Sequence, residues 1–140
     1  MPLVRIDLPD TVEPERRGLI GGIVYRAMAD VLNVPDGDKF QIIAAHGTDC
    51  LRIDPAYLGV DRSPKAFIID IILSAGRTVE LKRQFYATVA ERLNAEADVR
   101  PPGRDDRAHR GGKGGLVVRK RRGPMRLTSQ RVYWNDPARC

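Results

Sequence analysis

The apolar run from Ala66 to Leu73 constrains the fold more than any other stretch of this chain. It is rich in β-branched residues, and only Asp70 interrupts it. Such a run is typical of a strand that lies inside a sheet and is covered on both faces. We therefore predict a central strand over residues 66–73.

The opening stretch also has the pattern of a strand, because apolar and charged side chains alternate over residues 3–8. Pro2 stands before it and becomes the amino terminus if Met1 is removed. Free α-amino groups titrate near about pH 8, and burial or a nearby cation lowers this pKa. A neutral proline amine is a general base, and its rigid ring at the start of a strand would hold it in place. Many proteins begin with Met-Pro for no catalytic reason, so these two residues alone do not establish a site.

Two segments have the apolar periodicity of helices. Apolar side chains recur at spacings of three and four over residues 11–33, where Pro14 suits a first helical turn. A second helix, with Thr78 as its N-cap, ends before residue 100. A short strand over residues 39–45 completes the order strand, helix, strand, loop, strand, helix. This order predicts an α/β fold with a sixth element, a strand that closes a second β-α-β unit.

Length and composition exclude several classes of protein. The 140 residues fit one compact domain, and no apolar run approaches the roughly 20 residues that span a bilayer. Arg5 and Asp7 interrupt the early apolar stretch, so we expect no signal peptide. Two cysteines provide neither a disulfide framework nor zinc-binding spacing. We expect a cytoplasmic protein without a membrane segment, metal or cofactor.

Charge divides the chain at about residue 100. Residues 101–140 hold 11 of the 24 Lys and Arg residues but 3 of the 18 Asp and Glu residues, so this tail is about +8 and the rest about −2. Such an asymmetry marks either a functional basic tail or a foreign segment. We therefore divide the chain into a domain at 1–100 and a basic Arg/Gly-rich tail at 101–140.

Four segments in this order resemble the tautomerase superfamily: Pro2, the stretch NVPDGDKFQ at 33–41, the loop DPAYLGVDRS at 54–63, and SAGRT at 74–78. The similarity covers residues 1 to about 100 and is greatest to the branch of 4-oxalocrotonate tautomerase and malonate semialdehyde decarboxylase. It implies a repeated β-α-β unit, a mixed four-stranded sheet with two helices on one face, and a homotrimer with active sites between subunits.

The resemblance also implies roles for three residues. Pro2 would move a proton between carbon and oxygen of a small 2-keto or enol carboxylate, with no cofactor. Arg77 would hold the substrate carboxylate or the developing enolate, helped by amides at the start of the second helix. Asp38 matches an acid that orients or activates water in the decarboxylase and hydratase branches. The decarboxylase branch carries an arginine where this chain has Ala75, which favours simple tautomerisation.

Each of these residues also has a plainer interpretation. Arg77 fits an exposed residue at a helix start, and Asp38, which follows a glycine turn, fits a turn-stabilising residue. His46 and Arg62 fall in the polar loop predicted over residues 46–65, where a solvated position is the simpler expectation for both.

The tail departs from the family pattern. From Pro102 onward the family would supply a strand and then a hairpin with an Asp-Trp-Ser-Phe-Gly type segment, but residues 103–115 are rich in Arg and Gly without any period. If the codons for residues 103–124 are read one base later, one permitted translation contains an apolar strand followed by Asp-Trp-Ser-Phe-Gly. We hypothesise a frameshift near residues 101–103, in the gene or in its recorded sequence, and expect an irregular tail.

A competing interpretation takes the tail as a nucleic-acid-binding arm on an inactive tautomerase fold. Clustered cations bind phosphates with steep salt dependence, and aromatic side chains stack on bases. The residues for these roles are Lys113, Arg119, Lys120, Arg121 and Arg122 for phosphates, and Tyr133 and Trp134 for bases.

Overall fold

The computed structural model describes residues 2–56 and 62–99 with their side chains, and residues 127–134 as backbone. The elements in chain order are β1 (Leu3–Pro9), α1 (Pro14–Leu32), β2 (Gln41–His46), β3 (Phe67–Ser74), α2 (Val79–Ala97) and β4 (Leu127–Trp134). The predicted mixed α/β class and the two helices are confirmed. The strand expected over residues 39–45 begins two residues later and includes His46.

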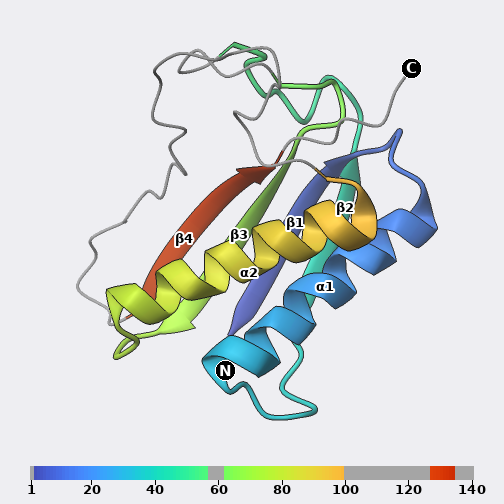
Figure 1. The fold of residues 1–140 in the computed structure, drawn as a ribbon. Coiled ribbons are helices and arrows are strands. Elements are labelled where there is room, and N and C mark those ends of the chain that lie inside the picture. Colours follow the sequence, from blue (N-terminus) through green and yellow to red (C-terminus); the bar gives the residue numbers. More distant parts are fainter. Residues whose placement is uncertain (1, 57–61, 100–126, 135–140) are drawn as a thin grey trace, which may run out of the picture.

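The strands form one sheet in the order β2-β1-β3-β4, with β1 in its interior (Figure 1). β1 runs parallel to β2, and Val4 pairs with Gln41. It runs antiparallel to β3, and Leu3 pairs with Ile72. Together β1, α1 and β2 make the first of the two expected β-α-β units.

The second unit is not completed in the expected way. A β-α-β crossover requires β4 to run parallel to β3, but β4 runs antiparallel to it, with Phe67 paired to Trp134 and Ser74 to Leu127. The tail was expected to be irregular, yet residues 127–134 form this edge strand. The rest of the tail lies outside the described residues.

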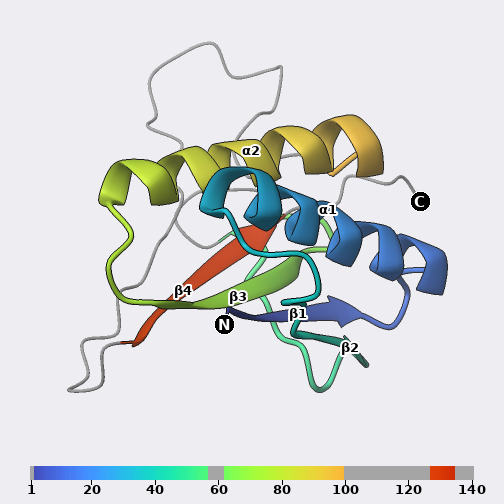
Figure 2. The same cartoon turned by 90° about the horizontal axis from the view of Figure 1, so that it is seen from below.

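Both helices lie on the same face of the sheet (Figure 2). The alternation in β1 explains why this face is the core, since Val4, Ile6 and Leu8 point toward the helices and are fully buried. They pack against apolar side chains from both helices and from β3, including Ile20, Ile23, Val24, Phe67, Ile69, Ile71, Leu73, Phe85, Val89 and Leu93.

The prediction that β3 is covered on both faces was wrong for this chain. Its side chains alternate between buried and half-buried, because the face opposite the helices carries Ile68, Asp70 and Ile72 without a covering layer among the described residues. The continuous apolar run concealed this alternation, since isoleucine occupies positions on both faces.

The helix ends follow local rules. α1 was predicted over residues 11–33. It begins at Pro14, which occupies the first helical turn as expected, and its C-cap Asn33 adopts the left-handed conformation (φ 51°). The predicted N-cap of α2 is confirmed, because the Thr78 hydroxyl accepts a hydrogen bond from the Leu81 N–H at 3.2 Å. None of the described helices is long and apolar enough to cross a membrane.

Gly21 marks the closest approach of α1 to β2. A Cβ built on Gly21 would lie 2.7 Å from Cδ1 of Ile43, whereas one built on neighbouring Gly22 meets nothing within 4 Å. The Gln41 amide also donates to the Gly21 carbonyl at 2.9 Å. The glycine that weakens α1 locally therefore allows β2 to pack closely.

We predict that Gly22→Ala raises the free energy of unfolding by about 1 kcal/mol, because alanine favours the helix. Gly21→Ala should raise it less or lower it, because the new methyl group displaces Ile43. Urea denaturation of both variants measures the difference. Equal stabilisation by the two substitutions would contradict the close packing.

Candidate active site

The three residues predicted for catalysis lie in segments that meet at one end of the sheet. Pro2 precedes β1, Asp38 precedes β2, and Arg77 lies between β3 and α2. Because β1 is parallel to β2 and antiparallel to β3, the beginning of β1 lies beside the beginning of β2 and the end of β3. Figure 1 shows the N-terminus at the end where α1 stops and α2 starts.

Pro2 is buried. Its strand is tied to the segment before β2 by a hydrogen bond from the Val4 N–H to the Phe40 carbonyl, at 2.9 Å. The parallel register begins with Val4 paired to Gln41, and Pro2 and Lys39, the neighbour of Asp38, each lie two residues before this pair. The position therefore combines a low exposure with proximity to the turn that carries Asp38.

Asp38 closes a tight turn and is half-buried. Its N–H donates to the Pro35 carbonyl at 3.1 Å. Gly37 inside the turn has φ 88°, a conformation that strains any other residue. The turn thus fixes the backbone on which the Asp38 carboxylate stands.

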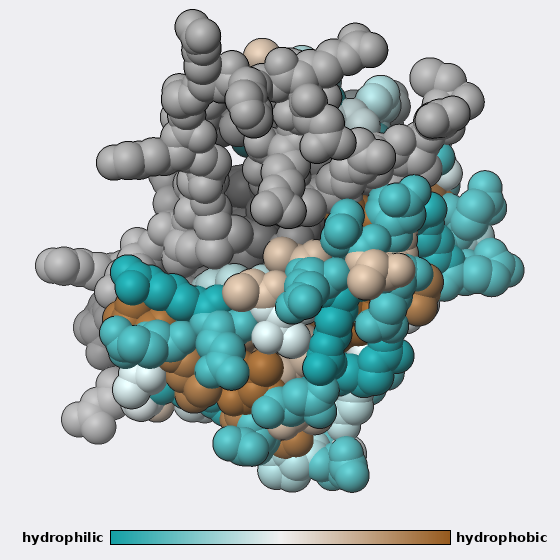
Figure 3. All heavy atoms as spheres, in the orientation of Figure 1, coloured by the Kyte–Doolittle hydropathy of each residue, from teal (hydrophilic) through white to brown (hydrophobic). Residues whose placement is uncertain are grey.

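Arg77 is half-buried in the connection between β3 and α2, where Gly76 adopts φ 109°. It makes no hydrogen bond or ion pair with another described residue. The first turn of α2 follows directly, and unpaired N–H groups at a helix start favour an anion. Figure 3 shows hydrophobic atoms exposed near this end of α2, where Val79 is 46% exposed.

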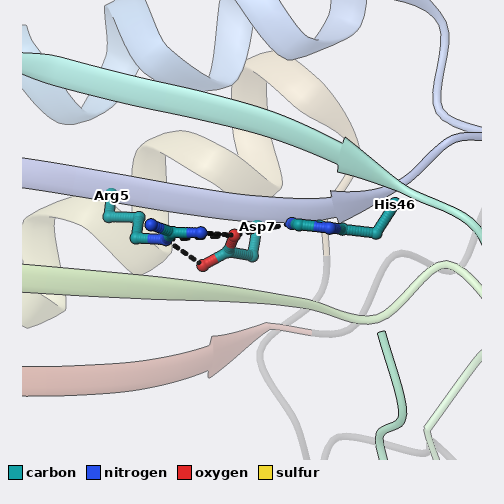
Figure 4. Close-up of polar contacts among 3 residues, drawn as sticks. All are labelled: Arg5, Asp7 and His46. Atoms are coloured by element: carbon teal, nitrogen blue, oxygen red, sulfur yellow. Dashed lines mark hydrogen bonds and ion pairs between the residues drawn. The ribbon is translucent and has the colours of Figure 1, made fainter. Parts of the chain in front are cut away.

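The open face of the sheet holds a charged cluster that the sequence did not reveal. The Asp7 carboxylate accepts hydrogen bonds from Arg5 at 2.9 and 3.0 Å and lies 2.7 Å from Nε2 of His46 (Figure 4). His46 is therefore not the solvated loop residue that was predicted, because it ends β2 and is a half-buried partner of Asp7. The alternation in β1 predicts that Arg5 and Asp7 share one face of the sheet. That His46 lies beside Asp7 depends on the register between β1 and β2, which the sequence does not show.

Electrostatics in this cluster favour the ionised carboxylate. Partial burial alone would raise the pKa of Asp7, but hydrogen bonds from Arg5 and His46 and their charges outweigh it and hold that pKa below its usual value. Asp7 in turn raises the pKa of Arg5. The cluster pins β1 to β2 from the side opposite the helices.

The remaining candidates are Arg62 and the residues proposed for nucleic-acid binding. Arg62 bonds within its own loop, through its N–H to the Pro55 carbonyl and its side chain to the Asp54 carbonyl. The cations proposed for nucleic acid, at 113 and 119–122, lie outside the described residues, and the side chains of Tyr133 and Trp134 do as well. In the described ranges, no three His, Cys, Asp or Glu side chains are grouped to hold a metal ion.

A mixed sheet with two helices on one face, and segments carrying Pro2, Asp38 and Arg77 that meet at one of its ends, form an α/β arrangement of the kind that the resemblance to tautomerases implies. Residues 38–103 match a sequence family described as "Tautomerase enzyme". The probable tautomerase YusQ of Bacillus subtilis (strain 168) is 31% identical over 100 residues, which cover 71% of this chain and 79% of YusQ. The chain belongs to the tautomerase family, as its sequence motifs predicted.

Solved structures agree with this assignment. FG41 malonate semialdehyde decarboxylase, inhibited by 3-bromopropiolate, is 37% identical with a TM-score of 0.59, over 66% of this chain and 71% of that one. The R7 fused 4-OT asymmetric trimer has the same fold, with 22% identity and a TM-score of 0.50 over 69% of this chain and 75% of that one.

We predict that Asp7→Asn lowers the free energy of unfolding by about 1 kcal/mol at pH 7, since both ion pairs are partly exposed to solvent. The folded pKa of Asp7 lies below its unfolded value, so the ionised carboxylate stabilises the fold above about pH 4 and loses this effect as the pH falls through the folded pKa. The difference in the free energy of unfolding between the wild type and Asp7→Asn should therefore be smaller at pH 3 than at pH 7.

Urea denaturation at pH 7 and pH 3 checks this expectation. Asp10→Asn is the matched control, because Asp10 is exposed next to the same strand. A loss of stability in Asp7→Asn that persists undiminished at pH 3 would contradict the assignment to the ionised carboxylate.

Proposed function

We propose that this protein is a cofactor-independent keto-enol tautomerase of small 2-keto or enol carboxylates, and that the amine of Pro2 is its general base and acid. The observation that carries the proposal is the burial of Pro2 at the end of the sheet where the Asp38 turn and the Arg77 connection also lie. A base and an anion-binding cation are the groups that such a proton transfer needs, and the Asp38 carboxylate stands on a turn at the same end of the sheet.

The position of Pro2 at the start of β1 favours the neutral form of its amine, which is the proposed base. Loss of Met1 leaves a secondary amine at the start of β1, and burial disfavours its protonated form. A nearby Arg77 would lower this pKa further, so that the amine is neutral near pH 7. The neutral nitrogen takes a proton from the carbon next to the ketone, the electron pair moves to the carbonyl oxygen, and the proton then returns to that oxygen.

Arg77 binds the substrate carboxylate or the enolate oxygen. Its guanidinium makes no bond to another described residue, and the N-terminus of α2 adds a favourable field for an anion. Stabilisation of charge that develops in the transition state is the most effective use of such a group. Asp38 orients water near the amine during the transfer.

The similarity to FG41 malonate semialdehyde decarboxylase, at 37% identity, raises decarboxylation as a second activity. This chain has Ala75 two residues before Arg77, where the decarboxylase branch carries an arginine. A single cation is enough to hold a carboxylate during tautomerisation. We therefore place decarboxylation of malonate semialdehyde behind tautomerisation.

We also propose that the protein acts as a homotrimer. The 4-OT relative of the same fold is a trimer. In this chain β2 is an edge strand with Ile42 45% and Ile43 39% exposed, and Phe40 beside it is 45% exposed. Exposed apolar side chains on an open strand edge are costly for a monomer and are usually covered by another chain.

The catalytic domain is residues 1–100, and the tail at 101–140 is a segment read out of frame. The antiparallel β4 supports this division, because a strand native to the second β-α-β unit would run parallel to β3. Sequencing the DNA near codons 101–103 tests it, and codons incompatible with the alternative reading would refute it. Salt-sensitive binding of nucleic acid that disappears on deletion of residues 101–140 would instead favour the binding-arm interpretation.

We predict that the purified protein ketonises an aryl enol-pyruvate well above the rate in buffer, and that Pro2→Ala lowers kcat/KM by about 100-fold or more, the scale of general base catalysis. Arg77→Ala should raise KM because it removes the cation that holds the carboxylate. An ultraviolet assay measures both, after intact mass has confirmed the loss of Met1.

Pro9→Ala is the control, because Pro9 ends the same strand at its far end. A folded Pro2→Ala variant with wild-type activity would overturn the proline mechanism. Faster turnover of malonate semialdehyde than of the enol would make decarboxylation the main activity.

A further inference from the structure

The segment that carries Asp38 is held on both sides by one side chain of α1. The Tyr25 hydroxyl accepts a hydrogen bond from the Gly37 N–H at 3.3 Å. The ammonium of Lys39 lies 5.2 Å from the centre of the Tyr25 ring, within the range of a cation–π contact. Gly37 and Lys39 are the two neighbours of Asp38 in the chain.

Backbone hydrogen bonds also hold this segment at its two ends and at its turn. After the end of α1, the Val34 N–H donates to the Met28 carbonyl at 3.4 Å, and the Asp38 N–H donates to the Pro35 carbonyl at 3.1 Å. Before β2, the Phe40 carbonyl accepts from the Val4 N–H at 2.9 Å. Glycine at position 37 allows the turn at φ 88°, but its lack of a side chain also gives the turn the most freedom to rearrange. Tyr25 connects this turn to the body of a packed helix.

We propose that Tyr25 is a positioning residue, which sets the place of the Asp38 carboxylate relative to Pro2 by tethering the residues on either side of it. The inference rests on the proposed function, because it assigns a catalytic consequence to the tether. A displacement of about 1 Å in a catalytic group can cost a large factor in rate. The ring and the hydroxyl contribute separately, since each contacts a different neighbour of Asp38.

Tyr25 is half-buried and stands apart from the fully buried core, so a change at its hydroxyl leaves the core packing intact. Its bond to Gly37 is also long for a hydrogen bond. The tether therefore acts on local order rather than on global stability, which separates it from an ordinary packing residue.

The test combines amide hydrogen exchange with kinetics on the full chain. In Tyr25→Phe, which keeps the ring, we expect exchange of the Gly37 amide to accelerate several-fold, while amides in β1 and β3 stay unchanged. The same variant should lower kcat about 3- to 10-fold with little change in KM, and Tyr25→Leu, which also removes the cation–π contact, should lower it further. Lys39→Met removes the cation on the Tyr25 ring and should also lower kcat. Lys65→Met, which removes a lysine at the opposite end of the sheet, is its control and should leave kcat unchanged.

The double variant Tyr25→Phe with Asp38→Asn decides whether Tyr25 acts through Asp38. We expect it to be no slower than Asp38→Asn alone. An equal loss from Tyr25→Phe in both backgrounds would overturn the inference, and so would full activity of Asp38→Asn. An inactive wild-type chain would contradict the proposed function, but unchanged Gly37 exchange in Tyr25→Phe would refute the tether independently of any activity.

Discussion

The pairing of β1 with two neighbours of opposite direction is the constraint on which the rest of the molecule depends. One parallel and one antiparallel partner bring the beginning of β1, the beginning of β2 and the end of β3 to the same end of the sheet. Three residues that are far apart in the sequence, Pro2, Asp38 and Arg77, lie in the segments that meet there. The register is fixed by the burial of Val4, Ile6 and Leu8, since a slip by one residue would turn Arg5 and Asp7 into the core.

The two faces of the sheet differ in their side chains. The helix-bearing face holds the apolar core, and the open face carries the ion pairs of Asp7 with Arg5 and His46. Asp7 and His46 lie near the C-terminal ends of β1 and β2, away from the end of the sheet where Pro2 lies. They stabilise the junction of two strands, whereas the groups proposed for chemistry stand on turns at the other end.

Sequence patterns were sufficient to predict both helices and the first three strands, but not β4 or some of the contacts between elements. The period of α1, the N-cap Thr78 and the motifs of the family could all be recognised locally, because each depends on neighbours in the chain. The bond between Asp7 and His46 could not be recognised in the sequence, because it depends on the register between β1 and β2. The antiparallel direction of β4 was equally hidden, because direction in a sheet is decided by pairing and not by the residues of one strand. The roles of Pro2, Asp38 and Arg77 remain predictions that the placement of their segments supports.

The most direct test of the account is the ionisation of the Pro2 amine itself. Titration of the chain with ¹⁵N-labelled proline, followed by NMR, would report this pKa without any choice of substrate. A buried amine at the end of the sheet where the Arg77 connection lies should titrate clearly below the value of about 8 that is ordinary for an α-amino group. On the proposed mechanism, Arg77→Ala should move this pKa upward. An amine that titrates at the ordinary value, or a chain that retains Met1, would contradict the central claim.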